Sequence, residues 1–256
     1  MKTILITGAG SGIGRATSVL LSEDPNTRLL LIGRSIESLN ETLALTKNST
    51  NHLTTSVDIS DASALESFLQ SPQAALNEHP LECVFANAGI GGPNDFGSND
   101  RWQQIIDINL TGAYNTCMSC YPWLFKSPTA TKHVVLTSSC LARFGVPGQT
   151  AYVASKTALT GLVRSLATTW SKEDILINAI APGWVETQMA KNSIQAMADA
   201  EGMSYEEMHK IQSNILPTGR MSEPVEIAQL IKFLFSGLQR SIVGQTIDIN
   251  NGSWMG

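Results

Sequence analysis

The chain has 256 residues, of which 43% are hydrophobic and 15% charged, and this composition excludes an intrinsically disordered protein. The formal net charge of −5 argues against nucleic acid as a partner, because phosphate binding needs a basic surface. No apolar run approaches the roughly 20 residues of a membrane span, and the run after Lys2 is too short for a signal peptide. We therefore expect a soluble, cytoplasmic protein that acts without a membrane partner.

Short apolar runs alternate with longer amphipathic segments along the chain. The runs predict seven strands, at residues 3–7, 28–32, 52–57, 81–86, 133–138, 175–180 and 245–249. The segments between them predict helices at 13–23, 35–45, 60–76, 100–126, 151–171 and 224–236. A β-α-β-α order indicates a parallel sheet with helices on both faces. The sequence therefore predicts one α/β domain over residues 1–256, with a doubly wound, seven-stranded, Rossmann-like parallel sheet.

The segment at 187–217 interrupts this alternation. It is rich in methionine, alanine and acidic residues, and we predict an inserted helical flap over the substrate rather than a second domain. Its methionines Met189, Met197, Met203 and Met208 suggest an adaptable apolar lining, and packing between helices is the plainer alternative.

Cys117 and Cys120 have the spacing of a redox or metal-binding pair. No second pair and no histidine cluster completes a metal site, so we expect no metal and interpret both as buried thiols in a reducing compartment.

A glycine-rich turn follows the first predicted strand, with the sequence Thr7-Gly8-Ala9-Gly10-Ser11-Gly12-Ile13-Gly14. Such a turn lets the backbone approach a pyrophosphate, whose charge the N–H groups of the next helix stabilise. We predict that Gly8, Ser11, Gly12, Ile13 and Gly14 bind a dinucleotide cofactor. A bare structural turn is the alternative.

The end of the second predicted strand bears on the choice of cofactor. An acid there binds the ribose hydroxyls of NAD(H), whereas an arginine pairs with the 2′-phosphate of NADP(H). The strand ends at Gly33-Arg34-Ser35 and the first acid is Glu37, so we predict a preference for NADP(H), with NAD(H) possible. After the third strand, Asp58 and Ile59 are candidates for contact with the adenine, although Asp58 could simply cap the next helix.

Candidate chemical groups gather at the ends of the other predicted strands. Ser138-Ser139 ends the fifth strand, Asn87-Ala88-Gly89 the fourth, and Pro182-Gly183 follows the sixth. Ligands of open α/β sheets bind at this carboxyl edge. Tyr152 and Lys156 lie four residues apart on one helix face, where a nearby ammonium would lower the tyrosine pKa and make it a proton donor and acceptor.

Together these motifs resemble the short-chain dehydrogenase/reductase family over nearly the whole chain, and in particular its 3-oxoacyl-carrier-protein reductase-like members. Residues 7–14 resemble the family's cofactor turn, and Ala86-Asn87-Ala88-Gly89 resembles its NNAG motif with Ala86 replacing the first asparagine. Ser139 lies thirteen residues before Tyr152, the family's common spacing, which favours it over Ser138.

The resemblance also implies roles for individual residues. It implies that Asn109, Ser139, Tyr152 and Lys156 are catalytic, with Asn109 supporting a proton relay. It implies that the cofactor contacts Asn87, Ala88, Gly89, Tyr152, Lys156, Pro182, Gly183, Val185 and Thr187, with Lys156 on the nicotinamide ribose. A homotetramer or homodimer is expected on the same grounds.

The sequence leaves three functions open. The first is an NADPH-dependent ketone reductase, and the second is an NAD-dependent alcohol or hydroxyacid dehydrogenase. The third is a non-catalytic dinucleotide-binding protein, which the set of Ser139, Tyr152 and Lys156 disfavours. All three imply a small carbonyl or alcohol molecule or a dinucleotide as the ligand. Whether Arg143 faces the substrate or the solvent also stays open.

Overall fold

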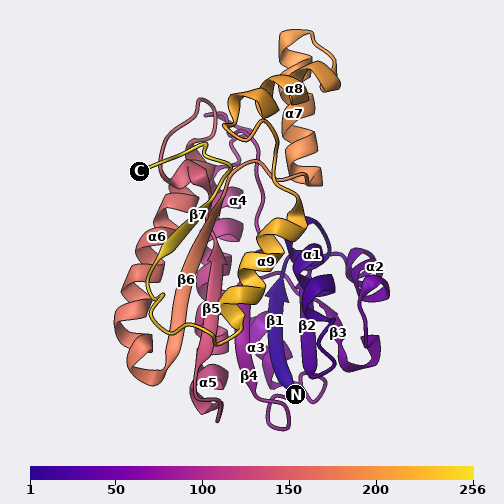
Figure 1. Cartoon of the computed structure of the whole chain (residues 1–256), viewed down its shortest axis with the longest axis vertical. Coiled ribbons are helices and arrows are strands. Elements are labelled where there is room, and N and C mark those ends of the chain that lie inside the picture. The colour runs from indigo at the N-terminus through magenta and orange to yellow at the C-terminus, as the bar shows by residue number, and fades with distance from the viewer.

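The computed structural model describes all 256 residues, and seven parallel strands form its single sheet in the order β3-β2-β1-β4-β5-β6-β7 (Figure 1). The strands are β1 (Lys2–Thr7), β2 (Thr27–Gly33), β3 (Leu53–Ser56), β4 (Leu81–Ala86), β5 (Lys132–Thr137), β6 (Ile175–Pro182) and β7 (Thr246–Ile249). All seven predicted strands are present, and the order reverses between β1 and β4. Cofactors bind at such a reversal in doubly wound folds.

Helices cover both faces of the sheet. On one face α1 (Gly12–Leu21) packs against α9 (Pro224–Phe235), beside α2 (Ile36–Leu45). On the other face lie α3 (Ala62–Gln70), α5 (Gly112–Lys126) and α6 (Thr150–Trp170). Three short 3₁₀ turns complete the fold, at Ser49–Asn51, Cys140–Ala142 and Ser171–Glu173. No helix combines the length and the hydropathy that crossing a membrane requires.

The strands are apolar throughout because each buries side chains on both faces. In β1, Ile4 and Ile6 belong to the core beneath α1 and α9, whereas Leu5 belongs to the core beneath α3, α5 and α6. The side chains of a strand point alternately to opposite faces, so a sheet covered on both sides needs an unbroken apolar run. This is why the runs could be recognised as strands of a parallel sheet.

The predicted helix at 60–76 is shorter in the structure. It runs over α3 only, from the N-cap Asp61, whose side chain accepts a hydrogen bond from the Ala64 N–H at 3.0 Å, to Gln70. Proline disfavours helical geometry in the residue before it, so Ser71, which precedes Pro72, ends the helix.

The predicted helix at 100–126 is interrupted in the structure. It begins as α4 (Trp102–Ile106), passes through a π-helical turn at Asp107–Thr111 and continues as α5. Such turns insert a residue into the helical repeat and frequently occur at functional sites. Here the π-helical turn contains Asn109.

Residues 187–217 form a helical hairpin of α7 (Gln188–Glu201) and α8 (Tyr205–Ile215), which stands above the carboxyl ends of the strands (Figure 1). The two helices share a small core with the segment that follows them, made of Ile194, Ala198, Met208, Leu216 and Met221. A β-bridge between Val185 and Ser222 closes the base of the excursion. We call residues 187–217 the flap; its closure over a substrate stays a prediction.

Candidate active site

A cavity of about 760 Å³ opens at the carboxyl edge of the sheet, beneath the flap. A second cavity of about 260 Å³ lies beside it, and the two share Gly8, Ser11, Ala88, Gly89 and Ile90. The larger cavity is lined by these predicted residues: Gly8, Ser11, Gly12, Ile13, Asn87, Ala88, Gly89, Ser139, Tyr152, Lys156, Pro182, Gly183, Val185 and Thr187. The smaller is lined by Arg34, Asp58 and Ile59. The shared wall makes one elongated site, as an extended dinucleotide requires.

The glycine-rich turn has the geometry of an anion cradle. Gly8 and Gly12 have φ angles of +65° and +50°, in the left-handed region that glycine adopts without strain. Ser11, the N-cap of α1, makes no side-chain cap, so no cap side chain occupies the N–H groups of the first turn. Gly14 lines neither cavity. A Cβ there would clash with the Gly8 carbonyl oxygen, so glycine lets the helix pack closely on the turn.

Thr7 and Thr137, which the sequence interpretation missed, connect three strand ends. The Thr7 Oγ1 accepts hydrogen bonds from the backbone N–H groups of Asn87 at 3.0 Å and Ala88 at 3.1 Å. The Asn87 Oδ1 accepts one from the Thr137 hydroxyl at 3.1 Å. The ends of β1, β4 and β5 are therefore held in register around the centre of the site.

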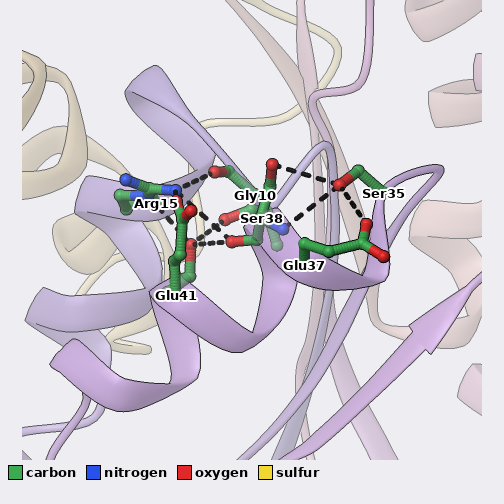
Figure 2. A network of polar contacts seen from close by, with 8 residues as sticks. Gly10, Arg15, Ser35, Glu37, Ser38 and Glu41 are labelled. Atoms are coloured by element: carbon green, nitrogen blue, oxygen red, sulfur yellow. Dashed lines mark hydrogen bonds and ion pairs between the residues drawn. The ribbon is translucent and has the colours of Figure 1, made fainter.

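The smaller cavity has serine hydroxyls beside Arg34. Ser35 and Ser38 line it, and the Ser35 Oγ accepts a hydrogen bond from the Ser38 N–H at 3.2 Å while donating to the Glu37 carboxylate at 2.9 Å (Figure 2). A guanidinium, hydroxyls and a helix N-terminus are the groups that bind phosphate. Glu37 is the one carboxylate bonded to this cluster.

Asp58 bonds Ser60 in the turn that follows β3. Its Oδ1 accepts hydrogen bonds from the Ser60 N–H at 2.9 Å and from the Ser60 hydroxyl at 2.7 Å. The backbone bond is the main reason that the pKa of Asp58 is lowered. Asp58 therefore makes a local turn with Ser60 and does not cap α3, whose N-cap is Asp61, and it also lines the smaller cavity.

Arg15 connects the glycine-rich turn to α2. Its Nη2 donates to the Glu41 carboxylate at 2.8 Å and to the Gly10 carbonyl, and its Nε donates to the Thr42 Oγ1 at 3.0 Å (Figure 2). These bonds tie the second half of α2 to the turn. Nothing in the sequence motif indicated this role.

Ser139, Tyr152 and Lys156 meet at the wall of the larger cavity. The Ser139 Oγ accepts a hydrogen bond from the Leu141 N–H at 3.1 Å, and a Ser139–Tyr152 hydrogen bond acts to lower the tyrosine pKa. The Lys156 Nζ lies 5.7 Å from the centre of the Tyr152 ring and donates to the Thr137 carbonyl at 2.8 Å. Ser138 instead donates its hydroxyl to the Lys156 carbonyl at 2.8 Å, which fixes the helix to the strand end.

The pKa values of the pair differ from the expectation that Lys156 makes Tyr152 more acidic. Burial raises the pKa of Tyr152 to about 12, because the phenolate loses its hydration. Burial also lowers the pKa of Lys156 to about 8. The expected lowering is absent because burial dominates and the lysine amine is directed at the Thr137 carbonyl. At neutral pH Tyr152 therefore holds its proton.

Asn109 lies behind the cavity wall rather than in it. Its side chain is 1% exposed, accepts a hydrogen bond from the Ile90 N–H at 2.8 Å and donates to the Ile90 carbonyl at 2.9 Å. It also donates to the Ser155 hydroxyl at 3.2 Å. Asn109 thus joins the loop after β4 to helix α6, next to Lys156.

The side chains above the chemical groups come from the flap and the loop after β5. Of the flap methionines, Met189 and Met197 line the larger cavity, Met208 packs inside the flap and Met203 is exposed. Arg143 lines neither cavity, because its guanidinium pairs with the Asp248 carboxylate of β7 at 3.0 Å. Its role is to hold the loop after β5 against β7.

Cys117 and Cys120 are both buried in α5, where burial raises the pKa of each thiol, that of Cys117 to about 12. They lie in the core beneath the sheet and away from both cavities.

Comparison with known proteins gives one consistent result. The family profile described as short chain dehydrogenase matches residues 2–198. The chain is 29% identical to a 3-oxoacyl-acyl-carrier-protein reductase of Thermotoga maritima, with 98% of this chain and 97% of that protein covered. It is 31% identical to the levodione reductase of Leifsonia aquatica, with 98% and 93% covered. The crystal structure of a variant of actinorhodin polyketide ketoreductase with NADPH superposes with a TM-score of 0.89 at 25% identity, over 98% of this chain and 96% of that one. The chain therefore belongs to the short-chain dehydrogenase family, and it is an NAD(P)-dependent oxidoreductase.

Proposed function

We propose that this oxidoreductase is an NADPH-dependent ketone reductase. The observation that carries the proposal is the meeting of Ser139, Tyr152 and Lys156 at the wall of a cavity that is continuous with the glycine-rich turn. The names of the relatives, a 3-oxoacyl reductase, a levodione reductase and a polyketide ketoreductase, support reduction of a ketone.

The chain's own residues supply proton transfer and positioning. The bound cofactor, when reduced, supplies the hydride that reaches the carbonyl carbon. Tyr152 gives its phenolic proton to the carbonyl oxygen, which becomes the hydroxyl of the product. Ser139 donates a hydrogen bond to the same oxygen and stabilises the charge that develops there. The Lys156 ammonium stabilises the phenolate left on Tyr152, which then recovers a proton from solvent.

Asn109 is a positioning residue in this proposal. Its amide fixes the backbone of Ile90 on both sides, and a Cβ at Gly89 would lie 3.1 Å from the Asn109 Oδ1 and 3.3 Å from the Lys156 Nζ. Asn109 therefore sets the space in which Lys156 and the ribose of the cofactor meet.

The preference for NADPH rests on the smaller cavity. Arg34, Ser35 and Ser38 offer a charge and two hydroxyls at the place where β2 ends, and the solved relative that superposes so closely contains NADPH. Glu37 favours the second candidate, an NAD-dependent alcohol dehydrogenase, because its carboxylate is bonded to Ser35 and would repel a 2′-phosphate.

We further propose that the enzyme is a cytoplasmic homodimer or homotetramer. Helix α5 presents Tyr114, Met118 and Phe125 to the surface, and these apolar side chains are 46%, 38% and 56% exposed. Buried free thiols at all four cysteines agree with a reducing compartment.

The proposal is tested by following NADPH and NADH absorbance with a panel of ketones, for the wild type, Tyr152→Phe and the surface control Tyr114→Phe. We expect NADPH consumption that falls at least about a hundredfold in Tyr152→Phe, because the general acid is lost. The control should retain wild-type turnover. Full activity of Tyr152→Phe would overturn the assigned roles, and oxidation of alcohols with NAD⁺ alone would establish the second candidate.

A further inference from the structure

The larger cavity contains almost no charge. None of the side chains that line it is an aspartate, glutamate, arginine or histidine, and Lys156 is its one cation. A substrate carboxylate or phosphate beside Tyr152 would lose its hydration there, away from the N–H groups of the glycine-rich turn. Burying a charge without a partner is strongly unfavourable.

Lys156 is already engaged in the proposed mechanism, where it stabilises the Tyr152 phenolate. Its Nζ donates to the Thr137 carbonyl at 2.8 Å, and a Cβ at Gly89 would lie 3.3 Å from it. The amine therefore lies beside the end of β5 and the loop after β4. Arg143 is the first cationic residue after Ser139 in the sequence, and its guanidinium is paired with the Asp248 carboxylate.

An apolar side chain of the flap lies next to Tyr152. A Cβ at Gly91 would be 3.1 Å from the Met189 Sδ and 3.9 Å from the Tyr152 Cε2, so these three residues converge. Met189 is 43% exposed although it lines the cavity, so its side chain lies where the cavity meets the solvent. A thioether is polarisable and adapts to apolar groups of different shapes.

Phe144, from the loop after β5, adds a second large apolar side chain, which the C-terminal tail supports. Phe144 lines the cavity and stacks on Trp254, with 6.3 Å between the ring centres. A Cβ at Gly252 would lie 2.9 Å from Pro217, so the tail also contacts the end of the flap. Three segments far apart in the sequence thus enclose one apolar space.

We infer that the substrate is an uncharged, largely apolar ketone, and that Met189 is the residue of the flap that excludes charged groups from the space beside Tyr152. The inference rests on the proposed reductase function and specifies its substrate class. It excludes hydroxyacids and phosphorylated sugars, whose anionic groups would meet Met189 and Phe144 in place of a cation.

The test compares matched ketones that differ in charge and by one methyl group: methyl 4-acetylbenzoate against 4-acetylbenzoate, and methyl 5-oxodecanoate against 5-oxodecanoate. We expect kcat/KM with NADPH to favour each ester over its acid by about a hundredfold or more, because the cavity offers the carboxylate no partner. An acid reduced as well as its ester, within threefold, would overturn the inference and leave the reductase function standing.

A pair of variants tests the role of Met189. Met189→Lys introduces a cation of similar length, and Met189→Gln is its uncharged control. We expect Met189→Lys to raise the acid-to-ester ratio of kcat/KM by about tenfold or more, as an opposite charge in a desolvated site does. The ratio in Met189→Gln should stay near that of the wild type. An unchanged ratio in Met189→Lys would show that Met189 does not control the charge of the substrate.

Binding separates the inference from the proposed function. Titration calorimetry of the same compounds into the enzyme saturated with NADP⁺ needs no turnover. If no ketone is reduced but the esters bind more tightly than the acids, the cavity has the proposed character and the reductase function is wrong. If the acids bind as tightly as the esters, the inference is wrong whatever the enzyme catalyses.

Discussion

Tyr152 and Lys156 show how one physical cause shifts two neighbouring groups in opposite directions. Burial disfavours the charged form of each, so the pKa of the phenol rises to about 12 and that of the amine falls to about 8. At neutral pH the phenol therefore keeps the proton that it would give to a substrate, while the amine, with a pKa of about 8, is still mostly protonated.

The Lys156 shift predicts a pH dependence of stability. The folded-state pKa of about 8 lies below the ordinary value of 10.5, so between these pH values the unfolded chain binds more protons than the folded one. The penalty of burying the ammonium is complete below about pH 8 and is relieved as pH rises above it. We expect the melting temperature of the wild type, relative to Lys156→Met, to rise on the order of 5 °C from pH 7 to pH 10.

Both proteins contain the cysteines and Tyr152. The effect of their pKa shifts on the melting temperature therefore cancels when the two proteins are compared at each pH. If the difference in melting temperature between the two proteins stayed constant from pH 7 to pH 10, the burial of the ammonium would be contradicted.

Cofactor choice is the second property set by single residues. Arg34→Asp should lower kcat/KM for NADPH by about 10- to 100-fold and raise that for NADH, because a charge-assisted bond to the 2′-phosphate is replaced by repulsion. Glu37→Gln should act in the opposite direction and strengthen NADPH binding, since it removes the carboxylate bonded to Ser35. The measurement is the ratio of the two kcat/KM values. If neither variant changed this ratio, Arg34 and Glu37 would not be the residues that recognise the 2′-phosphate of NADPH.

At the residue scale, sequence motifs indicated those candidate site residues whose positions follow from their spacing along the chain. Ser139, Tyr152 and Lys156 were found because they follow a strand end and lie on one helix face. Thr137 was missed, because it acquires its position from contacts across the sheet. Met189 was named only as one of four flap methionines, and its place beside Tyr152 depends on how the flap packs. Asn109 was found by resemblance, but its bonds to Ile90 depend on a π-helical turn that no spacing indicated.

At the element scale, strands were easier to predict than helix ends. The apolar runs follow from burial on both faces, whereas the end of α3 depends on Pro72, which was overlooked. The flap was expected as one helical insertion, yet signals for two helices were present. Thr187 caps α7, Gly202 ends it with a φ of +65°, and Ser204 and Glu207 form a capping box for α8.

The small core of the flap predicts that its packing can be disturbed without harming the cofactor site. Ala198 is fully buried between α7, α8 and the segment after them, so Ala198→Asp would place a charge in that core. We expect KM for the ketone to rise about tenfold or more, with local opening of the flap, while the Kd for NADPH changes little.

The measurements are steady-state kinetics, cofactor titration and limited proteolysis of the flap. Ala196→Asp, on the exposed side of the same helix, is the matched control and should resemble the wild type. Equal effects of the two variants, or loss of cofactor binding in Ala198→Asp, would show that the flap is not a separate unit.

At the scale of the whole molecule, the exposed apolar side chains of α5 predict self-association. Tyr114 and Met118 lie one helical turn apart, so they share a face of the helix. Sedimentation should give a mass that is a multiple of 27.5 kDa for the wild type. Met118→Glu should shift it toward the monomer, because it places a charge in the interface.

Leu238→Glu changes a side chain that is 82% exposed in the loop after α9 and serves as the control. A monomeric wild type, or an oligomer that Met118→Glu leaves intact, would contradict the assignment of this face.

The bridge between Val185 and Ser222 has a consequence for how such enzymes diversify. Because the chain leaves and re-enters the scaffold at neighbouring positions, we expect the part of the flap after Thr187 to be exchangeable. A segment of different length or chemistry can be inserted there without shifting the strands, the glycine-rich turn or the Ser139–Tyr152–Lys156 group. Evolution can therefore change the substrate by changing the flap while the catalytic residues stay the same.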